Sequence, residues 1–134
     1  MKTKYILDSN ICIHLLRNRK EIVDAISRVG WDKCCISELT VIELYYGAEC
    51  SNYPERNRKE VESFINDIEV LPFHLCIKEF CSQKARLRSI GILIEDFDLF
   101  IGSMAVATGY TLVTENIKHL TRLQGIKLEN WVQR

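Results

Sequence analysis

Short apolar runs that alternate with longer amphipathic stretches constrain the fold of this chain more than any other feature. The runs that predict strands lie at residues 4–7, 34–36, 69–73, 111–113 and 126–128. Strands that alternate with helices need crossover connections, and these produce a mainly parallel sheet that is covered on both faces. The sequence therefore predicts an α/β fold with a central sheet of about five short strands and helices on both faces.

The stretches between the strands carry helix boundary signals. Asn10 is expected to cap a first apolar helix, and Ser37 is expected to cap a helix that reaches residue 46. Pro54 is expected in the first turn of a further helix, because its missing N–H has no helical partner there. Residues 96–108 are almost entirely apolar and precede Gly109, so they predict a buried helix that ends at this glycine.

Length and charge limit the classes of protein that this chain can represent. Its 134 residues correspond to one domain, residues 1–134, which can bury a sizeable core. The 18 basic and 18 acidic side chains cancel, which excludes reliance on overall positive charge to bind nucleic acid. Neither a membrane span nor a secretory segment is present in the sequence, so we expect a cytoplasmic protein with six reduced cysteines.

Three carboxylates occupy positions that the pattern places against the core. Asp8 follows the first strand directly, and Asp98 lies in the first turn of the buried helix. Glu43 shares a helical stripe, expected to face the core, with Leu39, Ile42 and Tyr46. In doubly wound sheets, ligands bind at the carboxyl ends of the strands. A charged carboxylate buried at such an edge must be hydrogen-bonded, ion-paired or bound to a cation.

Each carboxylate also has a purely structural explanation. Asp98 fits a helix cap, and Asp8 fits a turn that ends its strand. Glu43 fits an ion pair with Arg86 or Arg88. Carboxylates that share one edge repel each other, however, unless a divalent cation neutralises them. Oxygen ligands with few nitrogens or sulfurs suit Mg²⁺ or Mn²⁺, so the chemistry favours an acidic metal site.

Five ordered segments carry a family resemblance. They are L-D-S-N at residues 7–10, S-E-L-T-V-I-E-L-Y-Y-G at 37–47, the pair 85–91 and 96–102, L-V-T-E-N at 112–116, and G-I-K-L-E-N-W at 125–131. The set covers the chain in order and resembles the PIN-domain ribonucleases, in particular the VapC-type toxins. The resemblance implies a PIN-like fold and a magnesium-dependent endoribonuclease that is the toxin of a toxin–antitoxin pair. It also implies an RNA substrate, a cognate antitoxin protein and a homodimer.

The same resemblance assigns roles to individual residues. The acidic ligands of the family correspond to Asp8, Glu43 and Asp98, which would bind Mg²⁺ or, alternatively, Mn²⁺. Asn116 stands where many members have an aspartate, and it is the fourth catalytic position by this correspondence. An amide oxygen brings no negative charge, so the choice between Asn116 and its neighbour Glu115 as the replacement stays open.

The expected mechanism is metal-assisted hydrolysis of a phosphodiester bond in structured RNA. Asp8 and Asp98 would hold the cation, while Glu43 would orient the attacking water or help to hold a second ion. Two polar residues, Asn10 and Thr114, are expected to support the site. The basic residues expected to contact RNA phosphates lead into the third motif and are Lys84, Arg86 and Arg88.

Two other classes of function remain as alternatives. One is a non-catalytic interaction domain with the PIN fold, which the missing fourth aspartate favours. The other is a phosphatase with Asp8 as nucleophile. Such enzymes need a second aspartate two positions later, where this chain has Asn10.

Overall fold

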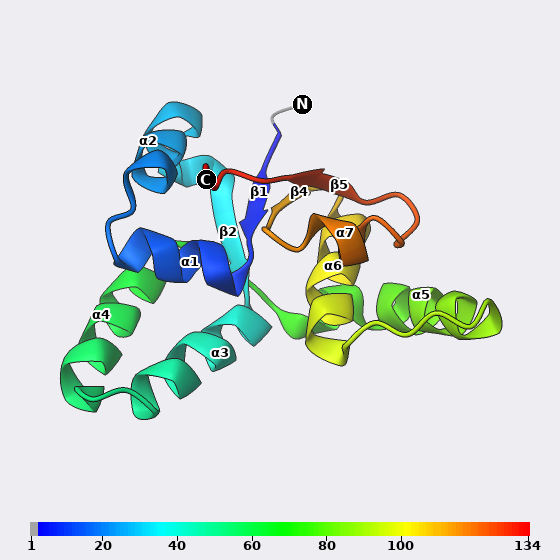
Figure 1. Ribbon diagram of the computed structural model, residues 1–134, viewed down its shortest axis with the longest axis horizontal. Helices are drawn as coiled ribbons and strands as arrows, with labels where there is room; N and C mark the ends of the chain where they lie inside the picture. The colour runs from blue at the N-terminus through cyan, green and yellow to red at the C-terminus, as the bar shows by residue number, and fades with distance from the viewer. Residues whose placement is uncertain (1–2) are drawn as a thin grey trace.

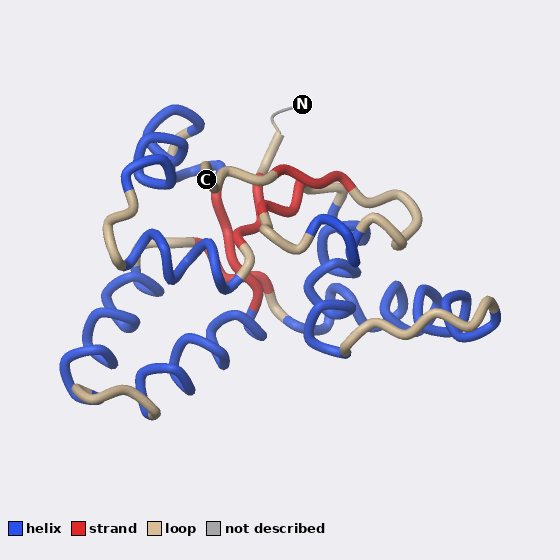
Figure 2. Tube along the Cα trace, in the orientation of Figure 1, coloured by secondary structure: helices blue, strands red, loops and turns tan. Residues whose placement is uncertain are grey.

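A five-stranded, fully parallel sheet forms the centre of the computed structural model, which describes residues 3–134 (Figures 1 and 2). The strand order is β3-β2-β1-β4-β5. The strands are β1 (Tyr5–Leu7), β2 (Cys34–Ser37), β3 (Glu69–Leu71), β4 (Thr111–Val113) and β5 (Lys127–Glu129). The predicted α/β class is therefore confirmed. The third strand ends two residues before the predicted limit, because Pro72 precedes a 3₁₀ turn, η2 (Phe73–Cys76).

Seven helices surround the sheet. They are α1 (Ser9–Leu16), α2 (Lys20–Val29), α3 (Glu38–Glu49), α4 (Pro54–Asn66), α5 (Ile77–Ser89), α6 (Asp96–Thr108) and α7 (Ile117–Leu120) within residues 3–134, with a further 3₁₀ turn, η1 (Trp31–Lys33). Figure 1 shows the first four helices on one side of the strands and α5, α6 and α7 on the other. The short helix α7 was not predicted, because four residues carry too little periodicity to be recognised.

Side chains of alternating strand positions divide the core into two parts. Leu7 and Val113 belong to the cluster that packs against α1, α2, α3 and α4. Ile6 and Leu112 belong to the cluster that packs against α5, α6 and α7. Since successive strand residues point to opposite faces, strands of three residues supply both clusters. This arrangement leaves the carboxyl edge of the sheet between the two helical layers.

The helix boundaries follow the predictions except at the start of α1 and at the end of α3, which continues to Glu49, three residues beyond the predicted end at residue 46. The Ser37 side chain accepts a hydrogen bond from Leu39 N at 3.0 Å and caps α3, and Pro54 is the first residue of α4. The prediction that Asn10 caps the first helix is wrong. The cap is Asp8, whose Oδ1 accepts a hydrogen bond from Ser9 N at 2.8 Å. Asn10 lies within the first turn of α1 and is exposed.

The helix α3 presents a different face to the core than the sequence pattern predicts. Its buried line contains Thr40, Leu44 and Ala48. Leu39 is buried as predicted, but Ile42 and Tyr46 are 55% and 70% exposed, so the prediction that these two residues face the core is wrong. Both lines have helical spacing, and contact with α1 and α4 decides which of them is buried. Glu43 lies beside the buried line and is half-buried rather than in the core.

The helix α6 is buried as predicted and ends at Gly109, which has a left-handed backbone conformation with φ of 74°. Gly102 permits α6 to pack closely against Leu123, because a Cβ atom at position 102 would lie 2.7 Å from Leu123 Cδ2. Asp98 lies four residues before Gly102, in the first turn of the same helix. Across residues 3–134, every helix is too short or too polar to cross a membrane.

Candidate active site

The carboxyl ends of β1 and β4 bring Asp8 and Thr114 together. Leu7 is paired with Val113 in the parallel register, so the next residue of each strand lies at the same edge. Asp8 N donates a hydrogen bond to Val113 O at 3.0 Å, and Thr114 Oγ1 donates to Asp8 Oδ2 at 2.7 Å. With Ser9 N bound to Oδ1, both carboxylate oxygens of this buried aspartate are held in place.

Glu43 reaches the same edge from α3. Its Oε1 accepts a hydrogen bond from Ser9 Oγ at 2.5 Å, and Ser9 Oγ lies 3.4 Å from Thr40 Oγ1. The partner of this glutamate is therefore a serine, and the alternative of an ion pair with Arg86 or Arg88 is wrong. Ser9 and Thr40 are both buried and were missed, because hydroxyl residues beside acidic ones carry no distinctive sequence signal.

Asp98 and Asn116 form the other side of the site. Asn116 Nδ2 donates to Asp98 Oδ2 at 3.0 Å, and Asn116 N donates to Thr114 Oγ1, also at 3.0 Å. The asparagine therefore uses its amide nitrogen to orient Asp98 and keeps its carbonyl oxygen available. The hydrogen bond between them brings the first turn of α6 to the segment that follows β4.

These residues line an open pocket of about 370 Å³. The residues that line it are Asp8, Ser9, Asn10, Glu43, Asp98, Glu115 and Asn116. The structure thus brings together all four candidate catalytic residues, although they are separated by up to 108 positions in the chain (116 − 8). Of the two residues expected to support the site, Asn10 is exposed and lines the pocket, and Thr114 is buried and hydrogen-bonded to Asp8.

The surroundings raise the pKa of all three carboxylates. Burial is the largest cause for Asp8, and the hydrogen bonds from Thr114 and Ser9 oppose it. Burial also raises the pKa of Glu43 and of Asp98, and neighbouring carboxylates add to both shifts. Carboxyl groups whose charged form is disfavoured in this way gain most from a cation in the same pocket.

The chemistry of the donor set fits a hard divalent cation. The pocket offers carboxylate and amide oxygens, and thiols and imidazoles are absent from its lining. Within residues 3–134, no group of three or more acidic, cysteine or histidine side chains is placed so that it could hold a metal ion by itself. Hydrogen bonds from Ser9, Thr114 and Asn116 engage one oxygen each of Glu43, Asp8 and Asp98. Mg²⁺ suits such a pocket, because it keeps several waters and needs only one or two direct carboxylate ligands.

The position of Glu115 bears on the question of the fourth acid. Glu115 lines the pocket, but its carboxylate is bound to His14 Nε2 at 2.6 Å and to Arg134. These two partners lower the pKa of Glu115, with the Arg134 hydrogen bond as the larger cause. Of the two candidates, Asn116 is the one in direct contact with Asp98.

The basic residues predicted to bind RNA lie on α5, and none of them lines the acidic pocket. Lys84 Nζ forms an ion pair with Asp96 Oδ1 at 2.9 Å. The Arg86 guanidinium is half-buried and donates to the carbonyl of Arg122 and to Gln83 Oε1. Arg88 is exposed. Arg86 therefore ties α5 to the segment after α7, which leaves Lys84 and Arg88 as the accessible cations of this group.

The fold and the carboxylates at its edge are those of a known class of protein. A family model described as the PIN domain matches residues 5–125, and the chain therefore belongs to the PIN domain family.

Relatives within that class are ribonucleases. The chain is 39% identical over 134 residues to "Ribonuclease VapC2" from Haemophilus influenzae, which covers 96% of this chain and 98% of the relative. It is 36% identical over 129 residues to "tRNA(fMet)-specific endonuclease VapC" from Salmonella typhimurium, with the same coverage of each chain. The resemblance to VapC-type ribonucleases is confirmed, and the chain is an RNA-cleaving hydrolase.

Solved structures agree with this assignment. VapBC from Salmonella typhimurium, crystallised bound to DNA, contains a chain with a TM-score of 0.90 and 34% identity, covering 97% of this chain and 99% of that one. VapBC2 from Rickettsia felis, bound to a DNA fragment from its promoter, gives a TM-score of 0.89 at 29% identity, with 97% and 100% coverage. The match over the full length confirms the PIN-like architecture.

Proposed function

We propose that this chain is the toxin of a toxin–antitoxin pair, an endoribonuclease that cleaves structured RNA with Mg²⁺ as its cofactor. The observation that carries the proposal is the convergence of Asp8, Glu43 and Asp98 on one pocket at the carboxyl edge of the sheet. Their raised pKa values and the oxygen-only donor set support a cation in that pocket. When bound, Mg²⁺ supplies a Lewis acid for the phosphodiester and lowers the pKa of a water molecule; Mn²⁺ supplies the same chemistry.

The residues of the chain bind the cation, orient its ligands and accept the proton of the attacking water. Asp8 and Asp98 provide the ligands, and each is pre-oriented by a hydrogen bond, from Thr114 and Asn116 respectively. Ser9 holds one carboxylate oxygen of Glu43 and leaves the other free to accept a proton from the attacking water. A carboxylate with a raised pKa is a better proton acceptor near neutral pH than an ordinary one.

Asn116 orients Asp98 and takes the place of the fourth acid. Its carbonyl oxygen can accept a hydrogen bond from a water in the pocket without adding negative charge. Asn10 lies at the rim of the pocket, where its amide is available to a substrate or a water. RNA phosphates outside the pocket are contacted by Lys84 and Arg88 on α5, both of which are exposed.

The partners follow from the relatives. Three similar solved structures are described as VapBC, which supports a cognate antitoxin for this protein as well. We further propose that residues 1–134 act as one domain, that the protein forms a homodimer, and that it works in the cytoplasm, where its RNA substrate is found. The exposed Ile42 and Tyr46 on α3 offer an apolar surface for contact with a second copy.

A cleavage assay tests this function. Purified protein, free of antitoxin, is incubated with total cellular RNA and with a defined stem–loop RNA, with Mg²⁺ or with EDTA. We expect discrete cleavage products only with Mg²⁺, and none from the Asp98→Asn variant in parallel. Absence of cleavage by the wild-type protein under every metal condition would favour the non-catalytic interaction domain instead.

A further inference from the structure

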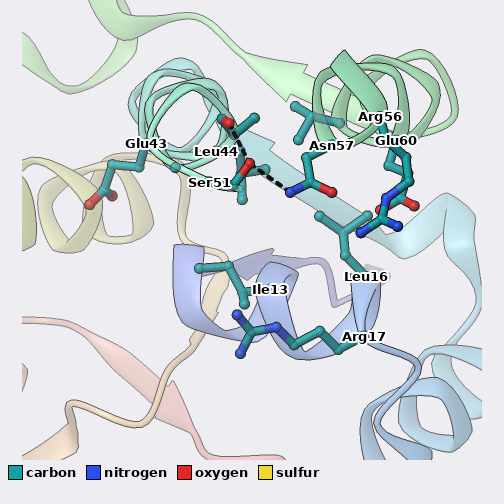
Figure 3. A pocket seen from close by; sticks show the side chains of 12 residues that line it. Ile13, Leu16, Arg17, Glu43, Leu44, Ser51, Arg56, Asn57 and Glu60 are labelled. Carbon is teal, nitrogen blue, oxygen red and sulfur yellow. Dashed lines mark hydrogen bonds between the residues drawn. The ribbon is translucent and has the colours of Figure 1, made fainter. Parts of the chain in front are cut away.

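A second cleft lies beside the acidic pocket, between α1, α3 and α4 (Figure 3). Its volume is about 410 Å³. Glu43 lines both this cleft and the acidic pocket, so the two hollows meet at that residue. In Figure 3, Glu43 lies at one end of the cleft, with Arg56 and Glu60 at the other. The hydrolytic chemistry proposed above makes no use of this space.

Apolar and polar residues contribute equally to the lining of the cleft. In Figure 3, Ile13 and Leu16 of α1 lie opposite Leu44 of α3, and Val61 of α4 also belongs to the apolar part of the lining. A cleft that combines apolar side chains with polar groups at fixed places can bind a small planar ligand. A nucleobase has such a shape, with apolar faces and a polar edge.

The polar groups of the cleft are suited to bind the phosphates of a nucleotide and the polar edge of its base. Arg17 and Arg56 both line it, are exposed, and form no ion pair within residues 3–134. Unpaired guanidinium groups bind phosphate in a two-pronged manner. Glu60 offers carboxylate oxygens that can accept hydrogen bonds from the amino groups of a base.

An exposed aromatic ring lies next to Arg56. Tyr53 is 61% exposed, and the Arg56 guanidinium carbon lies 4.6 Å from the centre of its ring. An aromatic side chain with an adjacent arginine is a stacking platform for the bases of single-stranded nucleic acid.

We propose that this cleft binds an unpaired nucleotide of the RNA strand, next to the phosphate that lies at the acidic pocket. The apolar side chains receive the base, Tyr53 stacks on its neighbour, and Arg17 and Arg56 bind the adjoining phosphates. The inference rests on the proposed nuclease function in one respect, that the strand passes over the acidic pocket. It adds that the substrate is unpaired at the cleavage site, as in a loop of a structured RNA.

The test measures RNA binding without cleavage. Fluorescence anisotropy follows a labelled single-stranded RNA of about ten nucleotides and mixed sequence, within the usual range of site sizes, in EDTA. The variants are Arg17→Ala, Arg56→Ala and Tyr53→Ala, which alter exposed side chains. The matched control is Arg58→Ala on the same helix, because Arg58 lies outside the cleft and pairs with Glu49 at 2.8 Å.

We expect Tyr53→Ala and Arg56→Ala to weaken binding about tenfold, and Arg58→Ala to leave it unchanged. Arg17→Ala should lower the slope of log Kd against log salt concentration by about 0.7, the value for one phosphate contact on a single strand. With a duplex of the same sequence as the probe, the effect of Tyr53→Ala should disappear, because its bases are already stacked.

Three results would overturn the proposal. They are undetectable binding of the single strand to the wild-type protein, equal binding by wild type and all three variants, and variants that lose only their affinity for the antitoxin. The last result would make the cleft a protein-docking surface. Because binding is measured in EDTA, a failure of the Mg²⁺-dependent cleavage assay leaves this readout intact and is recognised separately.

Discussion

The hydroxyl of Thr114 donates a hydrogen bond to Oδ2 of Asp8 over 2.7 Å, although 106 positions separate the two residues in the chain. Their strands are neighbours in the sheet, with Leu7 paired to Val113. Thr114 also accepts a hydrogen bond from Asn116 N at 3.0 Å. One buried threonine thus connects the first and the fourth position of the acidic site.

Replacement of Thr114 by valine should destabilise the protein without changing the shape of the side chain. The change leaves Asp8 Oδ2 and Asn116 N without their present partner in a buried place. We expect the free energy of unfolding to fall by about 1–3 kcal/mol, measured by urea denaturation in EDTA. Thr114→Ser keeps the hydroxyl and should retain most of the stability. Equal stability of the valine variant and the wild type would contradict this role.

The Asp98→Asn variant should separate catalysis from folding. Its side-chain oxygen can still accept the hydrogen bond from Asn116, but it no longer carries a charge beside Asp8 and Glu43. We therefore expect RNA cleavage to be lost while the melting temperature in EDTA stays the same or rises. A gel assay and a thermal melt on the same preparation check both. Cleavage at the wild-type rate would remove Asp98 from the catalytic residues.

The stability difference between these two proteins should depend on pH. Burial, and then the charge of Asp8, raise the pKa of Asp98 above its ordinary value of 3.8 in the folded state. A raised pKa means that the folded state favours the protonated form, so stability is lost as pH rises through the folded pKa. Relative to wild type, Asp98→Asn should be least favoured at and below pH 3.8, increasingly favoured as pH rises to the folded pKa, and constant above it. Melts at several pH values measure this trend, and a constant difference would exclude it.

Asn116→Asp should lower the stability of the metal-free protein and raise its affinity for metal. The substitution replaces the amide that donates to Asp98 with a fourth carboxylate. Without metal, the added repulsion should lower the melting temperature; with Mn²⁺, calorimetric titration should show tighter binding, because ligand charge chiefly holds hard cations. Asn116→Ala should reduce cleavage less than Asp8→Asn does. If Mn²⁺ affinity is unchanged in the aspartate variant and the alanine variant is fully active, position 116 takes no part in the site.

Expression of the chain alone should stop the growth of a bacterial host. Since this proposed toxin degrades RNA, co-expression of the antitoxin encoded beside it should restore growth. The Asp98→Asn variant is the matched control and should be harmless at the same level of soluble protein. Normal growth with abundant, folded wild-type protein would argue strongly against a toxin.

Much of the fold follows from local features of the sequence. The strand at residues 111–113 and the helix at 96–108 match the prediction to the residue, because apolar composition marks both and Gly109 ends the helix. The predictions were wrong where the local sequence is compatible with two different arrangements. Asp8 and Asn10 can each cap α1, and two different stripes of α3 can each face the core.

The sequence by itself determined the α/β fold and the position of Asp8 and Asp98 at the carboxyl edge of its sheet, and it indicated Glu43 as a third carboxylate there, since apolar runs and crossover helices leave few other arrangements. Only the tertiary structure decided the hydrogen-bond partners of those carboxylates. Ser9 holds Glu43, and Asn116 holds Asp98, while Glu115 turns to His14 and Arg134. These choices depend on distances of about 3 Å between segments far apart in the chain, and such distances are set by how α1, α3 and α6 pack rather than by any local pattern.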